Sequence, residues 1–264
     1  KILKKKYKWG TNEHYLYSGR KKIHPTYIQE ILSNKKNSKK NISLLIKELS
    51  KLDVKKFNAL NLYFINNFYK KNKFPECKPK NFLNNSKLLI VGPGESVNRE
   101  KSKIKKIINK EKLVVFYTNT VKNILGIKKF YRIACHPHRL ITDFIFHKTS
   151  NDVLILPTTN LPKKIFLDLK KYRKKLLNFG LKIMKKEEIK VRPTKCILPK
   201  PLIIAYSISV ALSGNTKKIY LAGFDGYRKD DPFNDETQEI FDIFKKKLKS
   251  NIFFSLTKTN YKIN

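Results

Sequence analysis

The chain of 264 residues carries a formal net charge of +39, with 59 basic against 20 acidic residues. Its hydrophobic content of 41%, with 12% aromatic residues, excludes a globally disordered chain and is sufficient for a sizeable core. Three widely spaced cysteines favour a reducing compartment and indicate neither a disulfide framework nor a zinc knuckle.

The positive charge has two interpretations. Of the 59 basic residues 52 are Lys and 7 are Arg, and Arg rather than Lys supplies forked contacts to phosphates and bases. A solvated lysine coat, enlarged by an AT-rich genome, is the interpretation we favour; attraction to an anionic membrane surface or glycan is the other. Specific nucleic-acid binding is not expected, because no binding motif occurs and the lysines spread along every predicted helix.

No apolar run reaches the length of a membrane span, and no signal-peptide pattern opens the chain. We therefore expect a cytoplasmic protein, with the inner face of the membrane as a peripheral location that the charge would suit. The first residue is Lys rather than Met, which leads us to expect a fragment or an incompletely known sequence.

Residues 1–84 are predicted to form a polar helical extension. Apolar side chains recur at roughly helical spacing between Ile42 and Ile65. A connector over 73–85, which contains Pro75 and Pro79, is expected to mark a domain boundary. The predicted organisation is a helical extension over 1–84 and an α/β domain over 85–264.

From Lys87 onward, short apolar runs alternate with helical patterns. This alternation is typical of a Rossmann-like α/β fold, a mostly parallel sheet covered by helices. The helix over 202–213 carries few charges and is expected to be largely buried. Strands are predicted over 87–91, 113–118, 130–135, 152–156 and 217–222, and helices over 98–111, 162–179, 202–213 and 235–248.

The first strand ends in a turn, Gly92-Pro93-Gly94-Glu95-Ser96, that leads into a helix. The glycines permit close approaches that a Cβ would block, and Ser96 can cap the helix. Free N–H groups at a helix start suit a phosphate. The third glycine of the dinucleotide fingerprint and the Lys-Ser/Thr of a P-loop are missing, so a nucleotide-phosphate site and an empty tight turn both remain open.

The second strand ends at Asn119, where open α/β sheets place ligand contacts. A turn-forming cap is the alternative role of Asn119. The third strand leads into His136-Pro137-His138-Arg139, whose two histidines can share a face. Because no Cys or carboxylate cluster completes a metal site, catalytic or substrate-contacting roles are expected instead. His147 has no such context and is expected at the surface.

The remaining candidates follow later strands. Asp225 comes after the strand over 217–222, beside two glycines, and an acidic loop over 230–236 either caps the next helix or contacts substrate or metal. The expected substrate contacts are Arg139, Thr158, Asn160, Tyr227 and Asp231.

Together these motifs resemble the bacterial sialyltransferase-like fold. Residues 91–96, Asn119 and the block 202–227 are similar to the Gly-x-Gly-Pro-Ser turn and Gly-x-Asp-x-Tyr strand end that flank a cytidine nucleotide in that fold. Residues 134–139, the loop over 156–162 and residues 222–234 resemble the C-terminal domain of surface-polysaccharide proteins that carry an aldolase domain in front. Residues 6–14 and 24–26 resemble the tail of an aldolase of the hydroxymethylglutaryl-lyase or 4-hydroxy-2-oxovalerate type.

This resemblance implies an inverting glycosyltransferase of surface-polysaccharide, including lipopolysaccharide, biosynthesis. It would transfer a 2-keto-3-deoxy sugar acid from a CMP donor to a glycan acceptor, with no further cofactor. The aldolase barrel is missing, so aldolase activity is not expected. The resemblance implies that Gly92, Pro93, Gly94, Ser96 and Asn119 hold the nucleotide.

The chain departs from the family pattern at Pro93 and Glu95, and residues 180–200 lack the histidine that serves as general base in the family. His136 is therefore our first choice for the base, with His138 or Asp225 as alternatives. Two other functions remain open: an Mg²⁺-dependent pterin or nucleotide diphosphokinase of related fold, and a non-catalytic basic scaffold that partners an aldolase. Assembly with further copies of the chain is also left open.

Overall fold

The computed structural model describes residues 74–136, 140, 143–161, 163–172, 175–183, 189–199, 201–227, 232–248 and 252–263. At residues 160, 163–165 and 232–233 it describes the backbone alone. The predicted helical extension therefore lies almost wholly outside the described residues, and the boundary at residue 84 stays a prediction.

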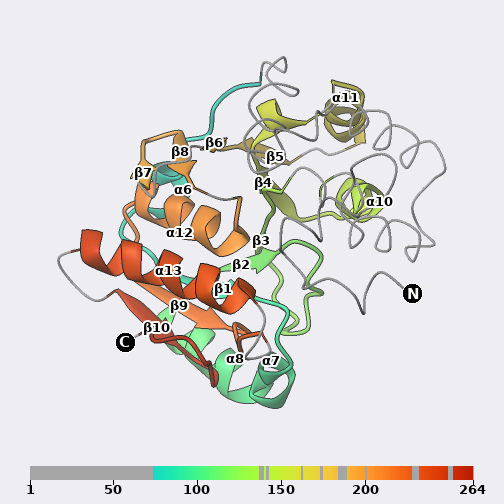
Figure 1. Ribbon diagram of the computed structural model, residues 1–264. Coiled ribbons are helices and arrows are strands. Elements are labelled where there is room, and N and C mark those ends of the chain that lie inside the picture. Colours follow the sequence, from blue (N-terminus) through green and yellow to red (C-terminus); the bar gives the residue numbers. More distant parts are fainter. Residues whose placement is uncertain are drawn as a thin grey trace, which may run out of the picture.

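Within these residues, a seven-stranded sheet runs in the order β10-β9-β1-β2-β3-β4-β5, and every neighbouring pair is parallel (Figure 1). The predicted Rossmann-like α/β class is confirmed. The strands are β1 Lys87–Val91, β2 Val114–Thr118, β3 Tyr131–Ile133, β4 Val153–Leu156, β5 Leu176–Asn178, β9 Lys218–Ala222 and β10 Phe253–Ser255.

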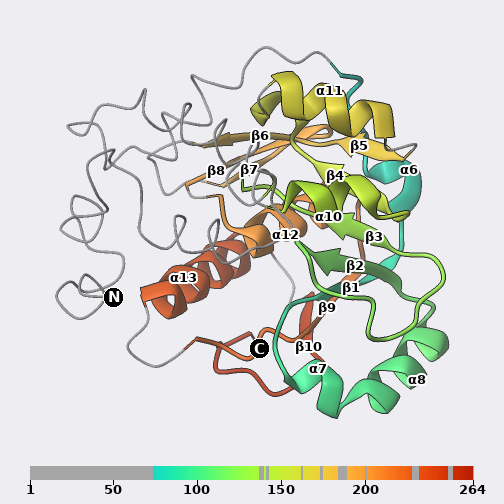
Figure 2. The ribbon, with the colours of Figure 1, turned by 90° about the vertical axis from the view of Figure 1, so that its right-hand side faces the viewer.

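Helices cover both faces of this sheet (Figure 2). A smaller sheet, in the order β6-β8-β7, lies beside it within the described chain. The helices are α6 Lys80–Leu83, α7 Ser96–Arg99, α8 Lys101–Glu111, α10 Phe144–Thr149, α11 Lys163–Tyr172, α12 Ile203–Ser213 and α13 Pro232–Lys247, with the 3-10 turn η3 Thr158–Asn160. The smaller sheet consists of β6 Gly180–Ile183, β7 Lys190–Val191 and β8 Lys195–Leu198.

Strand β1 is buried on both faces, which explains its unbroken apolar run. Leu88 and Ile90 belong to a core shared with α12 and α13, whereas Leu89 and Val91 belong to a second core shared with α8. Successive side chains of a strand point to opposite faces, so a strand with a core on each side needs apolar residues throughout.

Helix α12 fills the larger core, as its lack of charge predicted. Every residue from 204 to 211 is buried, and the helix ends at Gly214. A Cβ at Gly214 would lie 2.5 Å from the Cβ of Leu83, so α6 packs tightly against the end of α12. Leu83 is fully buried in the same core. Part of the predicted connector therefore packs with the α/β domain.

Three local predictions are corrected. The helix expected over 98–111 begins at Ser96 and is divided between α7 and α8, so Ser96 is its first residue rather than its cap. The helix expected over 162–179 ends at Tyr172, and the chain then returns to the sheet as β5. His147 is fully buried rather than at the surface, because the short helix α10 turns Phe144 and His147, three residues apart, inward together.

None of the helices in the described ranges is both long and apolar enough to cross a bilayer.

Candidate functional site

The order of the strands reverses between β1 and β9. Strands β1 to β5 extend to one side of this point, and β9 and β10 extend to the other. At such a switch point the loops that follow the two strands diverge, and open α/β sheets bind ligands outside the carboxyl ends there. In this protein the loops are residues 92–96, the β1 turn, and residues 223–227, the β9 turn.

The two turns interlock through their backbones. The Gly92 N–H donates to the Ala222 carbonyl at 2.8 Å, and the Gly94 N–H donates to the Gly223 carbonyl at 2.9 Å. A Cβ at Gly92 would lie 2.5 Å from the Gly223 carbonyl oxygen, and Gly223 itself has a φ of +72°. The glycines identified from the sequence are therefore required by the contact between the turns.

Asp225 reaches across this contact to Ser96. The Ser96 N–H donates to Asp225 Oδ2 at 3.0 Å, and the Ser96 hydroxyl donates to Asp225 Oδ1. Ser96 is buried, whereas Asp225 is half-buried. The carboxylate is thus fixed in orientation at the edge of the sheet, on a residue that is partly exposed.

This arrangement bears on the predicted phosphate contacts. The N–H groups of Gly92, Gly94 and Ser96 all donate within the protein, and Pro93 is exposed but has no N–H. A phosphate could reach the Ser96 N–H only by displacing the Asp225 carboxylate. A nucleotide role for these residues therefore stays a prediction, and the turns present two acidic side chains, those of Asp225 and of the exposed Glu95.

Asn119 follows β2 at the same edge. Its φ of +46° places it in the left-handed region, which supports the turn-forming role. Its N–H donates to the Ile133 carbonyl at 2.8 Å, and its carbonyl accepts a hydrogen bond from Arg132 Nη1 at 2.8 Å. Among the described residues, nothing pairs with its side-chain amide, so a ligand contact remains compatible with the turn.

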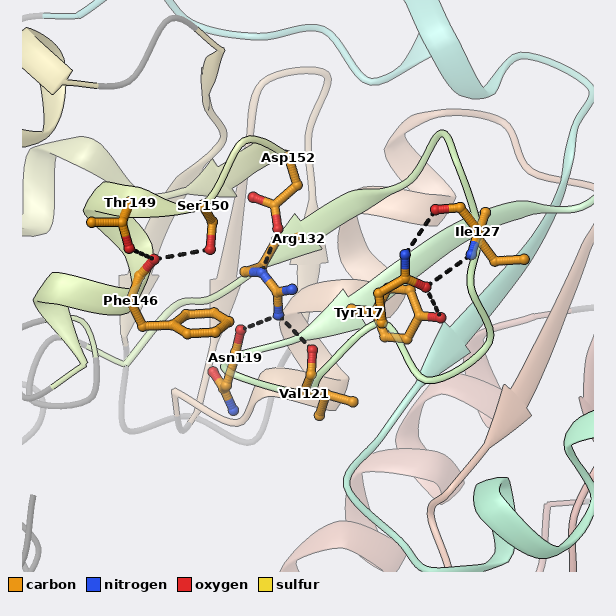
Figure 3. A network of polar contacts seen from close by, with 10 residues as sticks. Tyr117, Asn119, Val121, Ile127, Arg132, Phe146, Thr149, Ser150 and Asp152 are labelled. Carbon is orange, nitrogen blue, oxygen red and sulfur yellow. Dashed lines mark hydrogen bonds and ion pairs between the residues drawn. The ribbon is translucent and has the colours of Figure 1, made fainter.

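Arg132 holds this turn in place and was missed in the sequence (Figure 3). Its Nη1 also donates to the Val121 carbonyl at 2.8 Å, and its Nε donates to Asp152 Oδ2 at 2.7 Å. The side chains of Arg132 and Asp152 are both 3% exposed, and the guanidinium lies 4.7 Å from the ring centroid of Phe146. An arginine within an apolar strand was the available signal.

The other candidates follow β3, β4 and β9. His136 is half-buried, and its carbonyl accepts from the Leu140 N–H at 3.0 Å. Thr158 is buried, and its N–H donates to Asn178 Oδ1 at 3.0 Å. Asn160 belongs to η3, and its side chain is not described. Tyr227 is half exposed, and its N–H donates to Asn234 Oδ1 at 2.8 Å.

Strand order sets the spacing between these candidates. Two strands, β1 and β2, separate β9 from β3. At about 4.8 Å per strand spacing, the ends of β9 and β3 lie roughly 14 Å apart, so Asp225 and His136 start from distant points of the edge. The structure brings Gly92, Gly94, Ser96 and Asp225 together, whereas His136 follows a strand three places along the sheet from β9. His138, Arg139 and Asp231 lie outside the described residues.

Neither a metal centre nor an activated thiol emerges from the described part of the chain. No group of three or more His, Cys, Asp or Glu residues there could hold a metal ion. Burial raises the pKa of the Cys196 thiol to about 12 and that of Cys77 to about 11. The pKa of Cys135 is raised well above its usual value for the same reason. Such thiols are poor nucleophiles near neutral pH.

No family model matches this chain, and no curated protein matches it. Among solved structures, it is similar to the MAf glycosyltransferase from Magnetospirillum magneticum AMB-1, with 13% sequence identity and a TM-score of 0.45. The match covers 71% of this chain and 31% of that one, so the chain spans less than a third of that protein's length.

Proposed function

We propose that this domain is a glycosyltransferase that binds a nucleotide-activated sugar along the carboxyl edge of the sheet. The observation that carries the proposal is the Asp225 carboxylate, which Ser96 fixes at the switch point between β1 and β9. A carboxylate held in one orientation on a partly exposed residue is suited to accept a hydrogen bond from a sugar hydroxyl. Few but well-placed polar groups of this kind are typical of small-molecule sites.

The length of the edge supports an elongated substrate. The ends of β9 and β3, from which the chain leads to Asp225 and His136, lie roughly 14 Å apart, which exceeds one sugar ring but suits a nucleotide sugar. In this proposal the nucleotide lies over the β1 and β9 turns beside Asn119. The sugar then extends toward His136, Thr158 and Asn160, with Tyr227 and Asp231 as further contacts.

Local charge favours a donor with one phosphate. Glu95 is exposed in the β1 turn, and Asp225 lies directly beside that turn. Two carboxylates repel a diphosphate more strongly than the singly charged phosphodiester of a CMP-sugar. This argument supports CMP over UDP or GDP as the nucleotide, in agreement with the resemblance to sialyltransferase-like enzymes; the sugar acid as the transferred group is proposed from that resemblance alone.

The proposed reaction is a single inverting displacement. A base removes the proton of the acceptor hydroxyl while the hydroxyl oxygen forms a bond to the anomeric carbon. The bond from that carbon to the phosphate oxygen breaks, and CMP leaves with the electron pair. His136 is our first choice for the base, and His138 or Asp225 would replace it; Arg139 would stabilise the leaving phosphate.

A thermal-shift panel tests the nucleotide. A ligand that binds only the folded chain raises the unfolding temperature, so CMP should stabilise the protein more than CDP, UDP, GDP or ATP. Asp225→Asn should reduce this shift, whereas Glu239→Gln, exposed on α13, should not. His136→Ala should slow transfer or donor hydrolysis by about 10²-fold or more at unchanged CMP affinity. A loss smaller than about twofold would remove His136 as the base.

One observation favours the diphosphokinase as a second candidate. Asp225 and Glu95 place two carboxylates at the β1 turn, and carboxylate oxygens are ligands that Mg²⁺ prefers. Two carboxylates are too few to complete the coordination of Mg²⁺, so in this function the triphosphate would supply further oxygen ligands. Binding of ATP that requires Mg²⁺, with no response to CMP, would favour this function. No response to any nucleotide, with salt-sensitive binding to anionic vesicles, would favour the scaffold.

A further inference from the structure

The C-terminal segment of the described chain runs alongside the β9 turn. Strand β10 pairs with β9, and the Leu256 N–H donates to the Leu221 carbonyl at 2.8 Å, where the ladder ends. Beyond that point, residues 257–260, which we call the clamp, bind three consecutive residues of the β9 turn, namely Gly223, Phe224 and Asp225.

Each of the three contacts involves the backbone of the β9 turn. The Gly223 N–H donates to Thr257 Oγ1 at 3.1 Å, and the Thr259 hydroxyl donates to the Phe224 carbonyl at 2.6 Å. The Asn260 N–H donates to the Asp225 carbonyl at 3.0 Å. Where β9 ends, the clamp thus replaces the regular strand ladder with two side-chain hydroxyls and one backbone N–H.

We infer that the clamp positions the Asp225 carboxylate, which makes Thr257 and Thr259 positioning residues of the candidate site. As a statement about ligand binding, this inference rests on the proposed function. As a statement about the geometry of Asp225, it can be tested without any ligand.

The backbone around Asp225 explains why a clamp is needed. Gly223 and Gly226 flank it with φ values of +72° and +105°, and glycines allow a wide range of alternative conformations. A Cβ at Gly226 would lie 2.9 Å from Asn260 Nδ2, so the clamp also packs closely against the second glycine. External contacts therefore restrict a turn that its own sequence leaves free.

The clamp is itself well anchored. Thr257 is buried, and its carbonyl accepts a hydrogen bond from the Ser255 hydroxyl at 2.7 Å. Tyr261, which follows the clamp, is buried in the larger core beside Phe241, with ring centroids 5.7 Å apart. A segment fixed at both ends can transmit its position to Asp225 and, through the carboxylate, to Ser96.

Hydrogen exchange of the Ser96 amide in the ligand-free protein is the direct test. This N–H donates to Asp225, so its protection reports on the carboxylate. The variant T257V/T259V keeps the β-branched shape but removes both hydroxyls. It should accelerate exchange at Ser96 by about tenfold or more relative to Leu89 in the core of β1.

Thr194→Val is the control, because it likewise removes a threonine hydroxyl that is hydrogen-bonded, here to Glu76 Oε2 at 2.6 Å, in the turn between β7 and β8. It should leave the Ser96 amide unchanged. The variant T257S/T259S keeps both hydroxyls, so the Ser96 amide should be as well protected as in the wild-type protein. If the double variant fails to fold, Thr259→Val alone gives the same comparison. Unchanged Ser96 exchange relative to Leu89 in a folded variant would overturn the inference.

The effect of the clamp on CMP binding is tested by making the clamp substitutions with and without the Asp225 carboxylate. In the wild-type background, T257V/T259V should weaken CMP binding at least about fivefold; in the Asp225→Asn background it should change binding by less than about twofold. Equal losses in both backgrounds would show that the clamp acts other than through Asp225. If the wild-type protein binds no CMP, the proposed function fails, whereas the exchange experiment still decides whether the clamp positions the carboxylate.

Discussion

Gly94 admits the Asp225 carboxylate to the start of α7, since a Cβ at Gly94 would lie 2.5 Å from the Asp225 Cγ and 2.6 Å from its Oδ1. Two non-bonded carbons cannot approach so closely. Asp225 can therefore occupy its observed position only if residue 94 has no Cβ. The relationship links the β1 turn to the β9 turn.

Gly94→Ala should therefore destabilise the protein by about 1–3 kcal/mol, because the carboxylate must leave Ser96 or the β1 turn must shift. Asp225→Ala removes the atoms that would collide with the new Cβ. The double variant should consequently be more stable than the sum of the single changes predicts, by about 1 kcal/mol or more in urea unfolding. Additive effects would show that Gly94 and Asp225 do not interact in this way.

Asp152→Ala should cost about 3–5 kcal/mol, because it leaves the Arg132 guanidinium buried without its carboxylate. Lys103→Ala breaks an exposed ion pair with Glu100 and should change the free energy of unfolding by less than about 1 kcal/mol. Urea unfolding of both variants measures the contrast. Similar small effects of the two substitutions would mean that the Arg132–Asp152 pair contributes no more than a surface pair.

Leu83→Ala should cost about 2–5 kcal/mol, because Leu83, the last residue of α6, is fully buried against Gly214. Leu167→Ala is the matched control: Leu167 is 49% exposed on α11, and its substitution should cost less than about 0.5 kcal/mol. The comparison also tests whether α6 belongs to the α/β domain. A negligible effect at Leu83 would separate α6 from that core.

Alkaline pH should weaken the fold through its buried thiols. Burial raises the pKa of Cys196 from 9.0 to about 12, so the folded chain retains a proton that the unfolded chain releases above pH 9. Stability from this group is complete below pH 9 and falls as the pH rises toward 12. Cys196→Ala should reduce the decline in the free energy of unfolding between pH 8 and 10. Ile197→Val, next to it on β8, should leave the slope unchanged; an unaltered slope in Cys196→Ala would contradict the prediction.

The long apolar strands were predictable, because burial on both faces gives β1 and β2 a continuous hydrophobic signal. Strands β5 and β10 were not. Their place is set by pairing with β4 and β9 rather than by a pattern in their own residues. The lysine-rich pattern before β5 predicted a helix as far as residue 179. The helix ends at Tyr172 instead, and the chain pairs with β4 as β5.

The candidate site was predictable in part. Gly92, Gly94 and Asp225 could be identified because glycines and an acidic residue followed apolar strands. Their partners could not, because the contacts depend on β1 and β9 being neighbours in the sheet. Arg132, Thr257 and Thr259 carried weak signals for the same reason: their hydrogen bonds go to backbone groups of distant segments.

The position of β1 also has a consequence for how the chain folds. One edge of β1 is covered by β2, which follows after a single helical crossover, but the other edge is covered by β9, which is synthesised far later. Long-range parallel pairing of this kind closes slowly. A nascent chain that has not yet reached Lys218 exposes an apolar strand edge in the middle of its future sheet. Such chains are expected to aggregate through that edge until β9 and β10 dock.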